Sequence, residues 1–348
     1  MSAVLDSSGV YQHWSAGLDD YPVVLSVCGR SGRVAVGESG GRVSLFGRDG
    51  TLIRRWRAHA DAVMALAWNP STGDLLSGGQ DGCARLWRGI TVPDHEHCKI
   101  AFAKAWVDHV AFNPQGTRLA ACAGREIIFA NADGEEVVRA CDHASTVTGL
   151  AWRPNGEQVV TACYGGIQYV RADSALIKRR FKWSGSLISL ALSPDGNVAA
   201  CGCQDNSVHF WRLASGVDAM MSGYAAKPAL LSWRADSGLL AVASGAEITL
   251  WSFEGQGPEG MRPETLDGHD RPITTLAFAP RGACLVSGCR DGEVLCWLPG
   301  RSARPVFRHS GDGEVTRIAW ACSDESSSLV IAFSIGEIHQ LTFRRDFK

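Results

Sequence analysis

A short apolar run that ends in a turn recurs along this chain at intervals of 40 to 45 residues. Runs of this length, bounded by Pro, Asn, Asp and Gly, predict strands because these residues favour the backbone geometry of turns. Self-similarity at such a period indicates one structural unit repeated many times. The copies begin at Leu25, Leu66, Val110, Leu150, Leu190, Leu231, Leu276 and Ile318.

Each copy continues with further strand-like runs, such as DLLSGG and CARLWRG in the second copy, joined by the tight turn QDG. Four short antiparallel strands per repeat is the plan of a β-propeller blade. We therefore expect an all-β chain with eight blades of four strands, or seven if the weak first copy is only a loop. The segment Gly9 to Ser15 is expected to pair with the last three strands and complete the final blade. The prediction is one domain over 1–348, with a closing strand in 1–21, repeats in 22–343 and a tail in 344–348.

Two copies share a longer pattern in which His is followed by Ser after eighteen residues, by Asp after four more and by Trp after a further six. This pattern resembles WD40 repeats, and the chain as a whole resembles stand-alone, bacterial-type WD40 proteins with a single propeller. The resemblance implies a buried relay in which Asp accepts from His, His bonds Ser, and Ser meets the indole N–H of Trp. Since buried polar groups need partners, we interpret these sets as structural. They are His59, Ser77, Asp81 and Trp87, and His269, Ser287, Asp291 and Trp297.

Three other copies keep only part of this pattern, and we expect their blades to be looser and held mainly by packing. The fourth copy keeps His143 and Thr161 but has Gly165 and Arg171 at the positions of Asp and Trp. The fifth keeps Asp205 and Trp211 but has no His before its first strand, and the sixth keeps only Trp251.

Composition narrows the function further. The net charge of −2 gives no basic field for nucleic-acid binding, and the short basic run from Lys178 to Lys182 is interpreted as a solvated face. Neither a membrane-spanning apolar stretch nor a secretory signal is found, so we expect a cytoplasmic protein with reduced cysteines. No P-loop is present, and the Gly-rich stretch GESGG at Gly37 to Gly41 is a turn between strands with no following helix to present N–H groups to a phosphate, so we expect no enzyme activity and no cofactor.

The first functional hypothesis is a scaffold that binds other proteins or peptides on the propeller rim. The resemblance places this rim at the loops before the first strands and at the turns after the second strands. Aromatic and Arg side chains there are typical of binding hot spots, although the two tryptophans among them could equally pack between blades. The candidates are Trp106, Tyr164, Trp183, Arg125, Arg271, Arg290, Gln80, Gln204 and Glu38.

The alternative hypothesis is a metal-linked accessory protein. The segment PDHEHC, from Pro93 to Cys98, offers His95, His97 and Cys98 as ligands for zinc or a similar ion, although no CxxC pair completes the set. A polar surface loop remains the simpler interpretation. The resemblance to bacterial WD40 proteins adds a metallochaperone GTPase as a possible partner.

Overall fold

The computed structural model describes residues 10–343 except 90–95, 104, 136, 256 and 323–326. Within these residues the chain forms 31 strands in eight sheets. The described residues include no helix with the length and apolar character needed to cross a bilayer. The chain divides into two compact units, one from Val23 to Leu190 and one that joins Met1–Pro22 to Ala191–Lys348.

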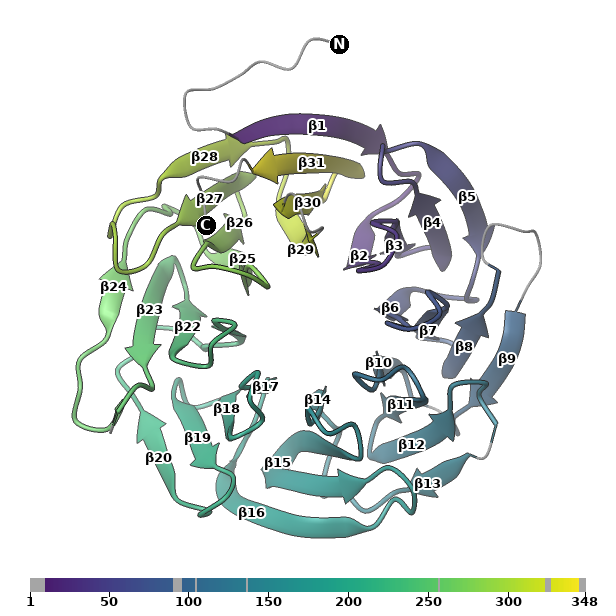
Figure 1. The fold of residues 1–348 in the computed structure, drawn as a ribbon, viewed down its shortest axis with the longest axis horizontal. Coiled ribbons are helices and arrows are strands. Elements are labelled where there is room, and N and C mark those ends of the chain that lie inside the picture. The colour runs from purple at the N-terminus through teal and green to yellow at the C-terminus, as the bar shows by residue number, and fades with distance from the viewer. Residues whose placement is uncertain are drawn as a thin grey trace. The chain divides into compact units, whose positions relative to one another are not determined.

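The unit from Val23 to Leu190 holds four antiparallel sheets that follow one another in chain order (Figure 1). The first sheet is β2 (Pro22–Val27), β3 (Val34–Glu38), β4 (Arg42–Phe46) and β5 (Leu52–Arg57). The second is β6 (Val63–Trp68), β7 (Leu75–Gly79), β8 (Cys83–Trp87) and β9 (Glu96–Ala101). The third is β10 (Val107–Phe112), β11 (Arg118–Ala123), β12 (Glu126–Asn131) and β13 (Val138–Ala140), and the fourth is β14 (Gly149–Trp152), β15 (Gln158–Arg171) and β16 (Ile177–Ser186).

The other unit also holds four antiparallel sheets. They are β17 (Ala191–Leu192), β18 (Val198–Gly202), β19 (Val208–Arg212) and β20 (Asp218–Met221); then β21 (Leu230–Trp233), β22 (Leu239–Ser244), β23 (Glu247–Ser252) and β24 (Glu264–Leu266). Next come β25 (Ile273–Phe278), β26 (Leu285–Cys289), β27 (Glu293–Trp297) and β28 (Phe307–Ser310). The last sheet combines β1 (Val10–Gly17) with β29 (Val315–Cys322), β30 (Ser327–Phe333) and β31 (Glu337–Phe343).

The prediction of eight blades is confirmed, and the seven-blade alternative is not. The weak first copy forms the complete sheet β2–β5, so it is no loop. The predicted N-terminal strand is β1, which pairs antiparallel with β31 from Val10 opposite Phe343 to Gly17 opposite Glu337. The two ends of the described chain thus share one sheet, and β1 covers the edge that β31 would otherwise expose.

The fourth sheet has three labelled strands because β15 doubles back on itself. The N–H of Ala172 donates to the carbonyl of Glu157 at 3.0 Å, so the two ends of the 14-residue β15 lie side by side. The reversal falls at Gly165 and Gly166, whose φ angles are 93° and 124°. A Cβ on Gly166 would lie 1.9 Å from the carbonyl oxygen of Phe181, so a side chain is excluded there.

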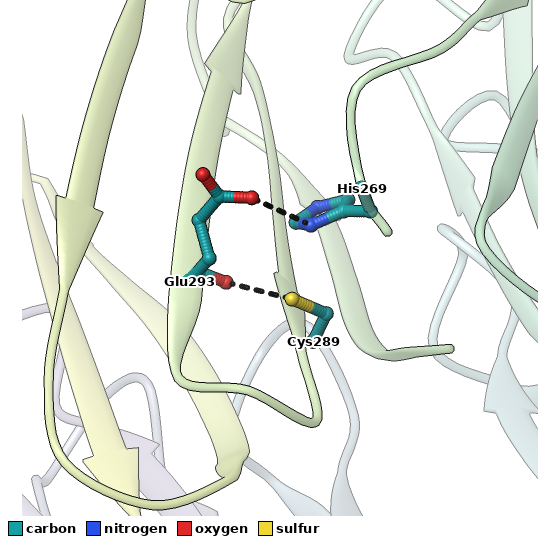
Figure 2. A group of neighbouring side chains, drawn as sticks. All are labelled: His269, Cys289 and Glu293. Atoms are coloured by element: carbon teal, nitrogen blue, oxygen red, sulfur yellow. Dashed lines mark hydrogen bonds and ion pairs between the residues drawn. The ribbon is translucent and has the colours of Figure 1, made fainter. Parts of the chain in front are cut away.

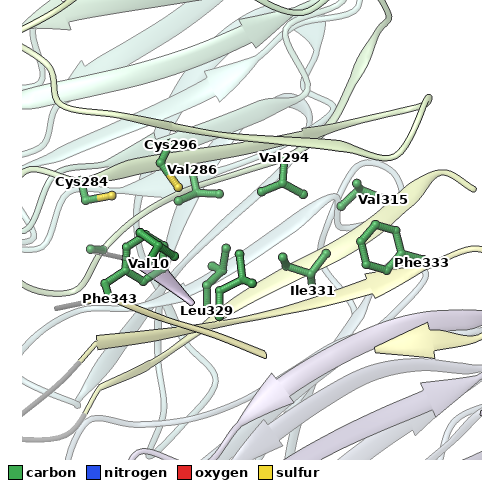
Figure 3. Packing of buried hydrophobic residues seen from close by; sticks show 12 residues of the cluster. Val10, Cys284, Val286, Val294, Cys296, Val315, Leu329, Ile331, Phe333 and Phe343 are labelled. Atoms are coloured by element: carbon green, nitrogen blue, oxygen red, sulfur yellow. The ribbon is translucent and has the colours of Figure 1, made fainter. Parts of the chain in front are cut away.

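The hydrophobic core lies between neighbouring sheets. Figure 3 shows one such layer, where Val294 and Cys296 on β27 face Leu329, Ile331 and Phe333 on β30. Side chains two residues apart on a strand share a face, so a five-residue strand supplies a row of such contacts. The second strands β3, β7, β18 and β26 are buried along their whole length, which explains their small apolar residues.

Candidate partner-binding surface

The first His-Ser-Asp-Trp set makes all three contacts of the expected relay. Ser77 Oγ lies 2.8 Å from Nε2 of His59 and accepts from the indole N–H of Trp87 at 2.8 Å. Nδ1 of His59 lies 2.9 Å from Asp81, whose other oxygen pairs with Arg85 at 2.7 Å. Burial lowers the pKa of His59, which favours the neutral ring, and Nδ1 also lies 2.6 Å from Nη1 of Arg85.

The second set makes two of the three contacts, and the expected bond between Asp291 and His269 is not formed. Ser287 Oγ lies 2.7 Å from Nε2 of His269 and accepts from Trp297 at 2.9 Å. Asp291 accepts instead from the thiol of Cys289 at 2.6 Å. The side chain of Cys289 stands beside His269 together with Glu293 (Figure 2).

In two of the incomplete sets, other groups of the chain provide hydrogen-bond partners that the sequence pattern did not indicate. His143 bonds Thr161 through Nε2 at 2.8 Å and donates from Nδ1 to the carbonyl of Arg125 at 3.1 Å. The indole N–H of Trp251 donates to the hydroxyl of Tyr224 at 2.8 Å. Backbone and tyrosine oxygens therefore fill the roles of the missing side chains, and the looseness of these blades stays a prediction.

The structure spreads the predicted rim residues over both compact units. Trp106 and Tyr164 are more than half exposed, and Arg271, Arg290 and Gln204 are exposed in the other unit. Gln80 is half-buried, and exposed Arg125 donates from Nε to the carbonyl of His143 at 2.6 Å. Of the predicted residues, the structure brings Tyr164 and Trp183 together in one groove.

Glu38 was expected to be an exposed residue of the rim, but in the structure it is buried. It is the last residue of β3 and is fully buried, because the strand continues through Gly37 and Glu38, where a turn was expected. Its carboxylate accepts a hydrogen bond from the hydroxyl of Ser44, which in turn accepts from Nε of Arg55 at 2.8 Å. Glu38 is thus part of an internal network and is not available to a partner.

The groove beside the β15 turn has a volume of about 490 Å³. Tyr164, Trp183, Gln168 and Lys182 line it together with the two turn glycines. The indole nitrogen of Trp183 lies where a Cβ on Gly185 would be only 2.5 Å away, so this glycine makes room for the ring. Gln168 is only 7% exposed, and its side-chain oxygen has no hydrogen-bond partner among the described residues. We call this the aromatic groove.

A second cavity of about 660 Å³ lies along β16, and most of the charged side chains that line it are basic. Its lining combines Arg139 and the run from Lys178 to Arg180 with the apolar side chain of Leu176, which is 64% exposed. The ion pair between Arg180 and Asp142, at 2.6 Å, lines both this basic cavity and the aromatic groove. The basic run was interpreted as a plain solvated face. The sequence did not indicate the cavity, because part of its lining, Arg139 to Asp142, lies about forty residues earlier in the chain.

The PDHEHC segment falls partly outside the described residues. Pro93 to His95 are not among them, whereas Glu96, His97 and Cys98 belong to β9. His97 is exposed, and the thiol of half-buried Cys98 donates to the carbonyl of Gly134 at 3.4 Å. Metal binding by His95, His97 and Cys98 stays a prediction.

Comparisons with known proteins fit this architecture. Four stretches match the family model described as WD domain, G-beta repeat: residues 50–88, 135–167, 178–212 and 260–297. The chain is 22% identical over 316 residues to Protein FIZZY-RELATED 1 of Arabidopsis thaliana and 25% identical over 285 residues to Ribosome biogenesis protein WDR12 homolog of Chlamydomonas reinhardtii. These matches cover 89% and 77% of this chain but only 57% and 60% of the relatives, so the chain spans less than two thirds of either.

The fold also matches a solved structure. The crystal structure of Sqt1 from Saccharomyces cerevisiae is similar with a TM-score of 0.79 at 15% identity, over 93% of this chain and 95% of that chain. The matching repeats and the eight blades together show that this chain carries WD40 repeats in an eight-bladed β-propeller fold.

Proposed function

We propose that this chain is a non-enzymatic interaction scaffold that binds an extended, acidic segment of a partner protein along β16. WD40 propellers generally act as scaffolds for protein interactions. The observation that carries the finer proposal is the position of β16, which is the last strand of its sheet and runs past both the aromatic groove and the basic cavity.

An edge strand offers backbone N–H and C=O groups to an incoming strand, which is a common way to bind extended peptides. β16 is ten residues long, so it can pair with a peptide of similar length. Its exposed Lys178, Arg179, Arg180 and Lys182 disfavour pairing between two copies of the same edge. The same charges attract an acidic strand and speed its encounter.

The two cavities supply anchoring sites on either side of the Arg180–Asp142 ion pair. Tyr164 and Trp183 offer aromatic surface, which dominates hot spots, and Leu176 offers a separate apolar contact. The unpartnered oxygen of Gln168 supports a ligand in the aromatic groove, because a buried acceptor gains most when a donor reaches it. A peptide backbone carries such donors at every residue other than proline.

The test uses labelled ten-residue peptides, matched to the length of β16, in which Leu alternates with either Glu or Lys. Fluorescence anisotropy should show binding of the Glu peptide and little binding of the Lys peptide. The double variant Lys178→Glu with Lys182→Glu and the single variant Tyr164→Ala should each weaken binding about tenfold or more. Lys227→Glu, an exposed lysine in the other unit, is the matched control and should bind as the wild type does.

Equal binding of the two peptides, or equal loss in the Lys227→Glu control, would refute the proposed site. The proposal also includes a cytoplasmic location and no direct contact with nucleic acid or membrane, which is supported by the net charge of −2. Fractionation of the native cells, with the protein followed by antibody, checks the location.

A further inference from the structure

Three metal-competent side chains converge beside the second His-Ser-Asp-Trp set. His269 precedes β25, Cys289 ends β26 and Glu293 begins β27. Each offers one ligand atom, and these atoms all lie within 4.8 Å of one another (Figure 2). Among the described residues no other group of His, Cys, Asp and Glu side chains meets this criterion.

Nδ1, the ligand atom of His269, has no hydrogen-bond partner among the described residues and pairs with Oε2 of Glu293 only at 3.4 Å. Ser287 holds Nε2, which turns Nδ1 toward Cys289 and Glu293. His269 is only 4% exposed, yet Nδ1 makes no hydrogen bond with any described residue. A buried ring nitrogen in this state is costly, so a ligand that fills the position is favoured.

We propose that His269 Nδ1, Cys289 Sγ and Glu293 Oε2 form a binding site for Zn²⁺. Thiolate, imidazole and carboxylate are the ligands that this ion takes in proteins. Two oxygen or nitrogen ligands of a tetrahedral Zn²⁺ lie roughly 3.3–3.5 Å apart, since their bonds are about 2.0–2.1 Å long. The distance from Nδ1 of His269 to Oε2 of Glu293 is 3.4 Å.

Neighbouring groups hold these ligands in place. Arg308 pairs with Oε1 of Glu293, which leaves Oε2 for the ion. Nε2 of His269 lies 2.7 Å from Ser287 Oγ, and in the tautomer in which Nε2–H donates to this hydroxyl, Nδ1 has a free lone pair for the ion. Asp291 lies 2.6 Å from Sγ of Cys289, so it receives the thiol proton when Zn²⁺ binds the sulfur, and it passes the proton to solvent because it is exposed.

The first set of this chain is an internal control, because it lacks these ligands. Gly79 stands where the second set has Cys289, and Cys83 stands where it has Glu293. Nδ1 of His59 is already bonded to Asp81 at 2.9 Å. We therefore expect metal at the second set and none at the first.

The experiment titrates the reduced, chelator-treated full-length protein with CoCl₂ as a spectroscopic probe and then displaces Co²⁺ with ZnCl₂. The expected result is one Co²⁺ per chain at this site, with a thiolate-to-cobalt charge-transfer band and the visible bands of tetrahedral Co²⁺. Glu293→Gln should weaken binding by at least about tenfold, and Cys289→Gly, which copies the residue at Gly79, should abolish the charge-transfer band. Far-ultraviolet circular dichroism checks that both variants are folded.

Cys98→Ser is the matched control, because it removes a thiol of the Pro93–Cys98 segment and should leave the band intact. The proposal is overturned if the wild-type protein shows no band, if the band survives in both Cys289→Gly and Glu293→Gln, or if Cys98→Ser removes it.

Discussion

Ser77→Ala tests whether the first relay stabilises its blade. The hydroxyl of Ser77 is fully buried and lies 2.8 Å from both His59 Nε2 and Trp87 Nε1. Alanine fits the site but leaves two buried polar groups without a partner, and His59 itself is only 2% exposed. Each unsatisfied group costs about 1–3 kcal/mol, so we expect the free energy of unfolding to fall by about 2–6 kcal/mol.

The assay is urea unfolding followed by circular dichroism, together with hydrogen exchange of the amides in β7 and β8. The exchange measurement is needed because a chain of this length need not unfold in one step, and it reports on the affected blade directly. Ser39→Ala, at an exposed serine of the same unit, is the control and should change stability little. A loss below about 1 kcal/mol in Ser77→Ala would show that the buried groups find other partners, and the reasoning would be wrong.

Three further predictions follow from other parts of the structure. Burial, with a smaller effect of His339, holds the pKa of His309 at about 4 in the folded protein, against 6.5 in the unfolded chain. The unfolded chain therefore binds the proton first, and stability should fall by on the order of 2 kcal/mol between pH 6.5 and 4, measured by urea unfolding; His309→Gln should flatten this dependence. Gly166→Ala forces a Cβ to within 1.9 Å of the Phe181 carbonyl at a φ of 124°, so we expect a loss of at least about 1–3 kcal/mol in the same assay. Removal of residues 1–17, which include β1, exposes the seven-residue edge of β31, and light scattering should show concentration-dependent association; a monodisperse truncated protein would contradict this.

The repeat pattern predicted the eight sheets because it depends on local chemistry. Turn residues and apolar runs determine where a strand begins and ends, and the recurrence at 40 to 45 residues gives the number of blades. The closing strand was also predictable, since the last copy lacked one strand and β1 had no other partner. These inferences require no knowledge of which side chains meet across the chain.

Less of the candidate binding surface could be predicted from the sequence. Tyr164 and Trp183 were singled out separately, but their meeting depends on the reversal of β15 at Gly165 and Gly166. The basic cavity needs Arg139 beside β16, and this contact joins residues about forty positions apart. Glu38 was misplaced for a local reason, since β3 continues through the expected turn and places this carboxylate in a buried network.

The two His-Ser-Asp-Trp sets show why equal spacing does not guarantee equal geometry. A Cβ at Gly79 would lie 2.3 Å from Nδ1 of His59, so glycine is what allows Asp81 to reach that nitrogen. At the matching position Cys289 fills the gap, and Asp291 turns to the thiol instead. The pattern lists the four residues that can form a relay, and the relay closes in the set that has glycine between Ser and Asp but not in the set that has Cys289 there. A cysteine there leaves the histidine nitrogen available, and the nearby Glu293 then converts a structural set into a set of ligands.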